Sequence, residues 1–174
     1  VLDREANQVL GTKTFFYRRN KTQQVVEGSF ESRDITNTFV DDLGNLDSIY
    51  RFVEYLYPIS TEREQLLQEG LLAQGDEAML KRYFLAFWQE KSPLRPQKEW
   101  LDYYKKVRYV NDKYSSSLRA GYKSDRGRVY LVYGKPDIIE QRAMEPNLPP
   151  YQVWQYNRVN TPFALSQTTI MFVF

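Results

Sequence analysis

AGYKSDRGRVYLVYGKPD, residues 120–137, is the stretch of this sequence that restricts the fold most. Gly121 suits the left-handed residue that follows a helix, and Gly134 ahead of Pro136 suits a tight turn. Between them, residues 129–133 alternate Val, Leu and Tyr in the period-2 pattern of a strand with one buried face. The stretch therefore predicts a helix end, a polar turn, a strand and a second turn.

Upstream, from Phe39 to Leu118, apolar residues recur at three- and four-residue steps, the period of amphipathic helices. Helix boundaries are predicted at capping side chains and at prolines, namely Asn45, Pro58, Thr61 with Glu64, Asp76, and the break Ser92–Pro96. The last helix is expected to run through Leu118 and to stop at Gly121.

Downstream, three runs are β-favouring: Ile138–Arg142, Tyr151–Tyr156 and Thr168–Phe174. The first is expected to pair with 129–133, and loops are expected at Met144–Pro150 and Asn157–Gln167. Two shorter β-favouring runs, Thr12–Arg18 and Val25–Phe30, precede the helices.

The resulting fold class is α+β, with helical hairpins of about four helices followed by a small antiparallel β-sheet. Residues 1–38 are expected to form an N-terminal β-rich segment or the end of a preceding domain. Residues 39–174 are expected to form the α+β domain itself, with helices in 39–120 and the sheet in 127–174. Because the sequence begins without Met or an apolar leader region and ends at Phe174 within a strand-like run, we expect a piece of a longer chain whose C-terminus is truncated.

Composition removes several classes of chemistry. The chain has no Cys and no His, which excludes thiolate catalysis and the commonest zinc ligands and general base. No carboxylate-rich metal loop is present, so neither metal nor cofactor is expected. A net charge of +2, with 24 basic and 22 acidic residues interspersed, argues against nucleic-acid binding. No apolar run is long enough to span a membrane, so any membrane association is expected through missing parts.

The turn Lys123-Ser124-Asp125-Arg126 has two interpretations. Asp125 with Lys123 or Arg126 could serve as the acid–base group of a hydrolase or carbohydrate-active domain. The favoured interpretation is structural: Ser124 or Asp125 caps the turn, while Arg126 or Arg128 pairs with Asp125 or Asp137. No catalytic residue is therefore assigned.

Aromatic residues make up 16% of the chain, an excess that suits either a thick core or a contact surface. The fourth helix places rings on more than one side, and its candidate partner surface comprises Trp100, Tyr103, Tyr104, Tyr109 and Tyr114. Both alternatives, core and partner surface, remain open at this stage.

The segment from Gly121 to Tyr130, followed by Tyr133 to Asp137, resembles the GWxTD-domain family of bacterial envelope proteins, found mainly in the Bacteroidetes. Tyr122 stands where the motif names Trp, and Ser124 where it names Thr. The resemblance covers about Phe39 to the end and implies that residues 39–174 form a GWxTD-like α+β domain. The motif and the capping argument together lead us to expect a structural corner, which comprises Gly121, Tyr122, Ser124, Asp125, Arg126, Gly127, Arg128, Gly134, Pro136 and Trp154.

The resemblance implies a secreted, periplasm-facing or envelope location and partners among other envelope proteins, with no activity that can be transferred. Together with the missing Cys and His, it leads us to expect a non-catalytic interaction or assembly module. The alternative is the hydrolase or carbohydrate-active domain centred on Asp125.

Overall fold

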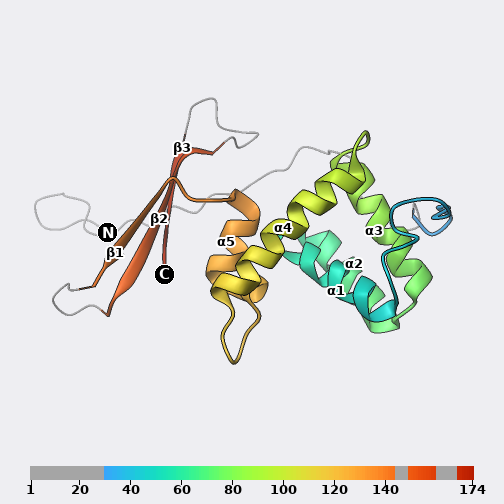
Figure 1. The fold of residues 1–174 in the computed structure, drawn as a ribbon, viewed down its shortest axis with the longest axis horizontal. Helices are drawn as coiled ribbons and strands as arrows, with labels where there is room; N and C mark the ends of the chain where they lie inside the picture. Colours follow the sequence, from blue (N-terminus) through green and yellow to red (C-terminus); the bar gives the residue numbers. More distant parts are fainter. Residues whose placement is uncertain (1–29, 144–148, 160–167) are drawn as a thin grey trace, which may run out of the picture.

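A computed structural model describes residues 30–143, 149–159 and 168–174, and it has a helical body joined to a small sheet by two packed helices (Figure 1). The elements in chain order are α1 (Leu46–Leu56), the 3-10 turn η1 (Tyr57–Ile59), α2 (Glu62–Gln74), α3 (Glu77–Lys91), α4 (Pro96–Tyr114), the 3-10 turn η2 (Gly121–Lys123), α5 (Asp125–Tyr133), β1 (Ile138–Arg142), β2 (Tyr151–Val159) and β3 (Thr168–Val173). The predicted α+β class is confirmed.

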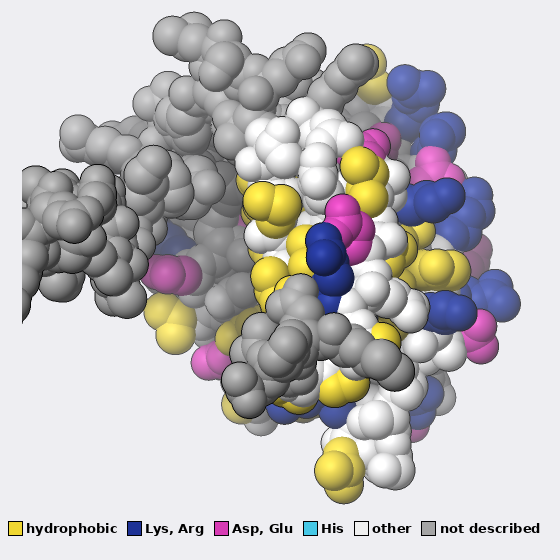
Figure 2. All heavy atoms as spheres, turned by 90° about the vertical axis from the view of Figure 1, so that its left-hand side faces the viewer, with side chains coloured by type: hydrophobic (Ala, Val, Ile, Leu, Met, Phe, Trp, Pro, Cys, Tyr) yellow, Lys and Arg dark blue, Asp and Glu magenta, His cyan; other side chains and the backbone are white. Residues whose placement is uncertain are grey.

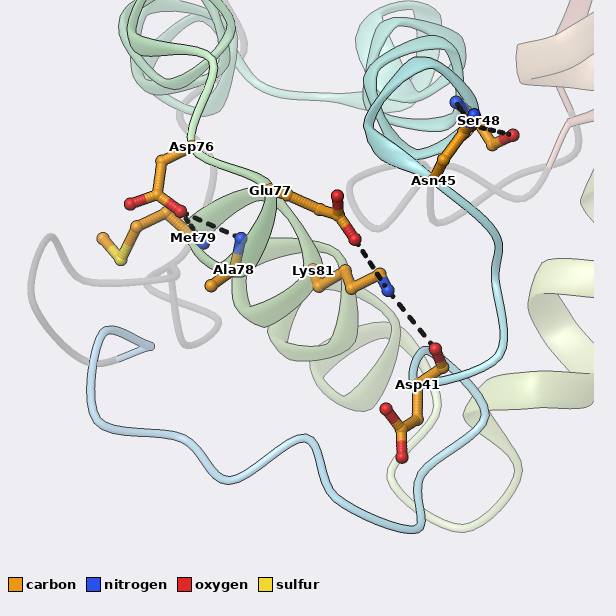
Figure 3. Close-up of polar contacts among 8 residues, drawn as sticks. All are labelled: Asp41, Asn45, Ser48, Asp76, Glu77, Ala78, Met79 and Lys81. Carbon is orange, nitrogen blue, oxygen red and sulfur yellow. Dashed lines mark hydrogen bonds and ion pairs between the residues drawn. The ribbon is translucent and has the colours of Figure 1, made fainter.

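The predicted helix starts are confirmed at the level of individual caps. Asn45 Oδ1 accepts from the Ser48 amide at 3.2 Å, and Asp76 Oδ1 accepts from the amides of Ala78 and Met79 at the start of α3 (Figure 3). Thr61 and Glu64 form the reciprocal capping box of α2, and Pro96 occupies the first turn of α4. Each cap satisfies amides that the first helical turn leaves without a partner.

The helical body is held by an aromatic core. Trp100 on α4 lies 4.8 Å from Phe84 and 5.0 Å from Phe52 between ring centroids, and it also contacts Trp88 at 5.8 Å. Phe84 and Trp100 are at most 2% exposed. Because each such ring buries roughly 150–250 Å², this cluster supplies much of the apolar surface removed from water.

The segment that precedes α1 packs onto this body. Phe30 is 1% exposed and meets Tyr83 edge-on at 5.5 Å between centroids. Lys81 on α3, itself paired with Glu77 at 3.1 Å, donates to the backbone oxygen of Asp41 at 3.3 Å (Figure 3). Residues 30–41 thus contact α3, and the boundary proposed at 38/39 stays a prediction.

The fourth helix is shorter than predicted. It ends at Tyr114, and Leu118, expected on its apolar face, is 96% exposed. The Ser115 side chain accepts a hydrogen bond from the Gly121 amide at 2.8 Å, which turns the chain back towards α4. Serine hydroxyls compete in this way with the helical pattern of backbone bonds.

Residues 129–133 are helical, so the predicted strand is wrong. They form the second half of α5, in which Gly127 and Leu131, four residues apart, are buried against the rest of the molecule. The alternation of apolar residues suited a strand, but the cap at Ser124 and the packing of α5 on α4 favour a helix. Gly121 does not have a positive φ, so the prediction of a left-handed residue there is wrong, whereas Gly134 has a φ of 81° and closes α5.

The three predicted strands downstream are confirmed, and they form an antiparallel sheet in the order β1-β2-β3. Because 129–133 is helical, β1 pairs with β2 instead, in a register that aligns Ile139, Trp154 and Phe172 across the sheet. β2 continues through Val159, into the predicted loop. Parts of the other predicted loops and strands lie outside the described residues. For the loops these parts are Met144–Leu148 and residues 160–167, and for the N-terminal strands they are Thr12–Arg18 and residues 25–29.

Candidate functional site

The corner predicted from the sequence is built on two glycines that allow backbones to touch. A Cβ on Gly121 would lie 1.9 Å from the Val110 carbonyl oxygen of α4, and a Cβ on Gly127 would lie 1.9 Å from the Gly121 oxygen. No side chain fits at either distance. Gly121 therefore brings η2 directly against α4, and Gly127 brings the start of α5 directly against η2.

Hydrogen bonds fix this contact. The Tyr122 amide donates to Asn111 Oδ1 at 2.9 Å, beside the bond from the Gly121 amide to Ser115. The Ser124 hydroxyl donates to the Gly121 oxygen at 2.7 Å, and its oxygen accepts from the Gly127 amide at 3.0 Å. Ser124 is thus the N-cap of α5, which confirms the structural interpretation of its hydroxyl.

Tyr122 and Lys123 attach the corner to α1. The Tyr122 ring meets Tyr55 edge-on at 4.8 Å, and its hydroxyl donates to Glu54 Oε2 at 3.3 Å. Lys123 Nζ lies 3.1 Å from Glu54 Oε1 and 5.3 Å from the centre of the Tyr122 ring. Hydrogen bonding to Tyr122, and then to Glu54, raises the pKa of Lys123, so the ammonium stays charged here.

The arginines of the corner bind differently from the prediction. The expected ion pair of Arg126 or Arg128 with Asp125 or Asp137 is absent among the described residues. Arg126 Nε instead donates to Gln152 Oε1 on β2 at 3.2 Å, and its guanidinium lies 5.3 Å from the Phe174 ring centre. Arg126 therefore connects α5 to the sheet.

The same Gln152 oxygen also accepts from Trp154 Nε1 at 2.8 Å. Trp154 is fully buried, and its ring centroid lies 5.6 Å from that of Tyr114 and 5.0 Å from that of Phe174. Pro136, in the connection from α5 to β1, is also buried. The Tyr156 hydroxyl donates to the Gly134 oxygen at 3.0 Å. These contacts form a second, smaller core that holds the sheet against the helices.

The candidate aromatic surface is largely core. Trp100 and Tyr103 are 2% and 6% exposed, and Tyr104 is partly buried against Trp100. Tyr109 is 45% exposed, with its ring 4.8 Å from Tyr130 and 6.3 Å from the partly buried Tyr114. The prediction of a partner surface is thus wrong for Trp100 and Tyr103, because their rings are needed inside.

An open groove of about 860 Å³ lies beside the corner, between the end of α4, the start of α5 and the end of β3. Its walls include Ser124 and Asp125 on one side and residues 172–174 on the other. Asp125 is the only carboxylate among the described residues that line it, so acid–base chemistry with two carboxylates has no second group there. Lys113, Arg119 and Arg126 make the groove basic.

β3 forms one edge of the sheet, and among the described strands it pairs only with β2. The segment Thr168–Phe174 contains no charged residue, and Met171 and Val173 are 64% and 66% exposed. The opposite edge, β1, carries an ion pair between Glu140 and Arg142 at 2.7 Å. Charged residues are the usual protection of an edge strand, and β3 lacks them.

Figure 2 views the molecule from the side of the sheet and shows hydrophobic side chains interspersed with polar ones, while Lys and Arg gather along one margin. Sequence reasoning missed the groove and the open edge, because both depend on the pairing of β2 with β3 and on the helical state of α5. The one local signal was the charge-free run at the end of the chain. No helix among the described residues is long and apolar enough to cross a membrane.

A family described as "GWxTD domain" matches residues 15–174. No curated protein and no solved structure matches the chain. The match contains the whole corner, with Tyr122 and Ser124 at its centre. The chain therefore belongs to the GWxTD-domain family.

Proposed function

We propose that this domain is a non-catalytic interaction module that binds an extended segment of a partner protein in the groove beside β3. The observation that carries the proposal is the uncharged edge of β3 opening onto a basic groove. Strand addition to a free sheet edge is a common way to bind a peptide, because main-chain hydrogen bonds supply affinity whatever the side chains.

The backbone of β3 is oriented for such an addition. Gln152 and Phe174 exchange both of their backbone hydrogen bonds, each at 2.9 Å. In an antiparallel pair this pattern alternates, so the N–H and C=O groups of Met171 and Val173 point away from β2. Among the described residues no strand pairs with these groups, so they suit an added strand.

The groove also favours one kind of segment. Lys113 and Arg119 are exposed on the wall opposite β3, and Leu118, which lies between them in the sequence, is 96% exposed. A partner segment that alternates acidic and apolar residues would satisfy both features, since successive side chains of a strand point to opposite faces.

Peptide selection tests this proposal. Random linear peptides displayed on phage are selected on the immobilised protein, and the winners are synthesised and titrated by fluorescence anisotropy. We expect enrichment of Asp and Glu, and slower amide exchange at Met171 and Val173 in the complex. Failure to select any peptide, or exchange that is unchanged along β3, would contradict strand addition.

A proline pair provides the matched control. Met171→Pro removes an outward-pointing N–H from β3. Gln141→Pro removes an outward-pointing N–H from β1, because Gln152, which lies opposite Gln141, directs its own backbone bonds to β3 instead. Proline is tolerated at edge positions of this kind. We expect Met171→Pro to weaken peptide binding by about tenfold or more, and Gln141→Pro to leave it unchanged, with circular dichroism confirming the fold of both.

We also propose that the module works in the periplasm or cell envelope, as a subunit of a complex with other envelope proteins. Family membership supports this proposal through the resemblance described above. Protease treatment of intact and osmotically opened cells tests it: the full-length protein should be degraded once the outer membrane is opened. Protection until the inner membrane is broken would contradict the proposed location.

A further inference from the structure

A separate pocket of about 280 Å³ lies between the η1 end of α1, the middle of α2, and the η2–α5 corner. It shares no lining residue with the groove beside β3. Apolar surface comes from Tyr57, Pro58 and Leu72, and the corner contributes Tyr122 and Lys123. The proposed interaction role does not use this pocket.

A buried amide in the pocket wall has an unused acceptor. Gln68 is 1% exposed, and its Nε2 donates to Ser60 Oγ at 2.7 Å and to the Tyr83 hydroxyl at 2.9 Å. Ser60 donates its own proton to the Leu56 oxygen at 2.9 Å, so it can only accept from Gln68, which fixes the orientation of the amide. Gln68 Oε1 has no donor among the described residues.

A buried acceptor without a donor is unfavourable, and most buried polar groups in proteins have a hydrogen-bond partner. A ligand that brings an N–H or O–H to this wall would satisfy Gln68 Oε1.

The pocket also offers two side-chain charges without an ion-pair partner among the described residues: Arg128 on α5 and Glu69 on α2. Lys123 and Glu54, by contrast, neutralise each other at 3.1 Å. Arg128 and Glu69 are both exposed, so they stand at the mouth of the pocket, while the unmet acceptor is buried in its wall. A ligand that carries both charges and several donors matches all three groups, whereas a neutral sugar would pair with neither charge.

We propose that this pocket binds a small zwitterion of the α-amino-acid class. The carboxylate pairs with the Arg128 guanidinium, the ammonium donates to Gln68 Oε1 and to Glu69, and the side chain lies against Tyr57, Pro58 and Leu72. The volume suits a single amino acid and is below that of pockets for larger ligands, which begin at roughly 300 Å³.

Ligand-detected NMR with the intact chain tests the proposal. The probes are free L-amino acids, the same compounds with the carboxylate converted to an amide, the same compounds N-acetylated, and neutral monosaccharides. We expect saturation transfer to free amino acids with apolar side chains, and its loss when either terminus is blocked. Equal signals from blocked compounds or from monosaccharides, or no signal from any amino acid at millimolar concentration, would overturn the assignment.

Variants locate the site. Arg128→Gln should weaken amino-acid binding by about tenfold or more, since it removes a charge-assisted hydrogen bond. Arg108→Gln changes an exposed arginine of α4 outside the pocket and should bind as the parent does. Equal affinity in both variants would overturn the proposal, as would a high-resolution structure with only a water on Gln68 Oε1 in saturating amino acid. Peptide binding at β3 should survive Arg128→Gln.

Discussion

Gly121→Ala should be among the most destabilising single-methyl changes in the molecule. The added Cβ would lie 1.9 Å from the Val110 oxygen, 2.6 Å from the Val110 carbonyl carbon and 2.7 Å from Asn111 Cα, all of them backbone atoms. Since real Cβ atoms keep at least 3.0 Å from such neighbours, η2 must retreat from α4 by more than an ångström. No side-chain rotation can relieve the clash.

The retreat has a calculable cost. It stretches the bonds from the Gly121 amide to Ser115 and from the Tyr122 amide to Asn111, now 2.8 and 2.9 Å, beyond hydrogen-bonding range. Two lost bonds at about 1 kcal/mol each, with about 1–3 kcal/mol of overpacking strain, give about 3–5 kcal/mol. Such a loss is a large part of the stability of an ordinary domain, about 5–15 kcal/mol.

Urea denaturation of the full chain, followed by far-UV circular dichroism and tryptophan fluorescence, measures this cost. Gly70→Ala is the matched control, because Gly70 is exposed within α2 and has no atom within 4 Å of the added Cβ. It should stabilise the protein by about 0.5–1 kcal/mol, through the better helix propensity of alanine. A loss below about 1 kcal/mol in Gly121→Ala would refute the backbone contact as the basis of the corner.

Three further changes probe other contacts. Ser124→Ala should cost about 1–2 kcal/mol in urea denaturation, because it removes the α5 cap, whereas Ser124→Thr keeps the hydroxyl and should stay within about 0.5 kcal/mol. Trp154→Ala should cost about 3–5 kcal/mol and raise amide exchange in β2 and β3 first, since this ring fills the core under the sheet. Burial raises the pKa of Tyr103 and of Tyr83 in the folded protein. The free energy of unfolding should therefore be constant with respect to these two groups below pH about 10, the pKa of an unfolded tyrosine, and should fall as the pH rises further. Tyr103→Phe should lose about 1 kcal/mol of stability at neutral pH, because it removes the hydrogen bond of 2.6 Å to the Tyr55 oxygen. The stability of this variant should also fall less steeply above pH about 10.

The sequence predicts the elements whose boundaries depend on neighbours along the chain. Asn45, Thr61 and Asp76 bind amides two or three residues away, so their caps follow from local pattern. The strands Ile138–Arg142 and Thr168–Val173 likewise follow from composition. Neither set needs a long-range contact to be recognised.

α5 was missed because two signals conflicted. Alternation over residues 129–133 favours a strand, while Ser124 as a cap, Asp125 in the first turn and Gly134 at the end favour a short helix. The outcome is decided by the fit of Gly121 against α4, a contact between segments that no local pattern reports, and by the fit of Gly127 against Gly121. The groove and the pocket follow from that fit, so neither could be derived from the sequence.

One turn shapes both hollows. Tyr122, Lys123 and Arg128 line the pocket on the side of α1 and α2, while residues 124–126 line the groove beside β3. Any change that moves η2 away from α4 displaces the walls of both, so loss of binding in Gly121→Ala would not say which hollow holds a ligand. Arg128→Gln and Met171→Pro each alter one hollow and leave the backbone contact of Gly121 intact. If the two variants abolish different ligands, the corner is a scaffold for two independent sites; if either one abolishes both, the two hollows act as one site.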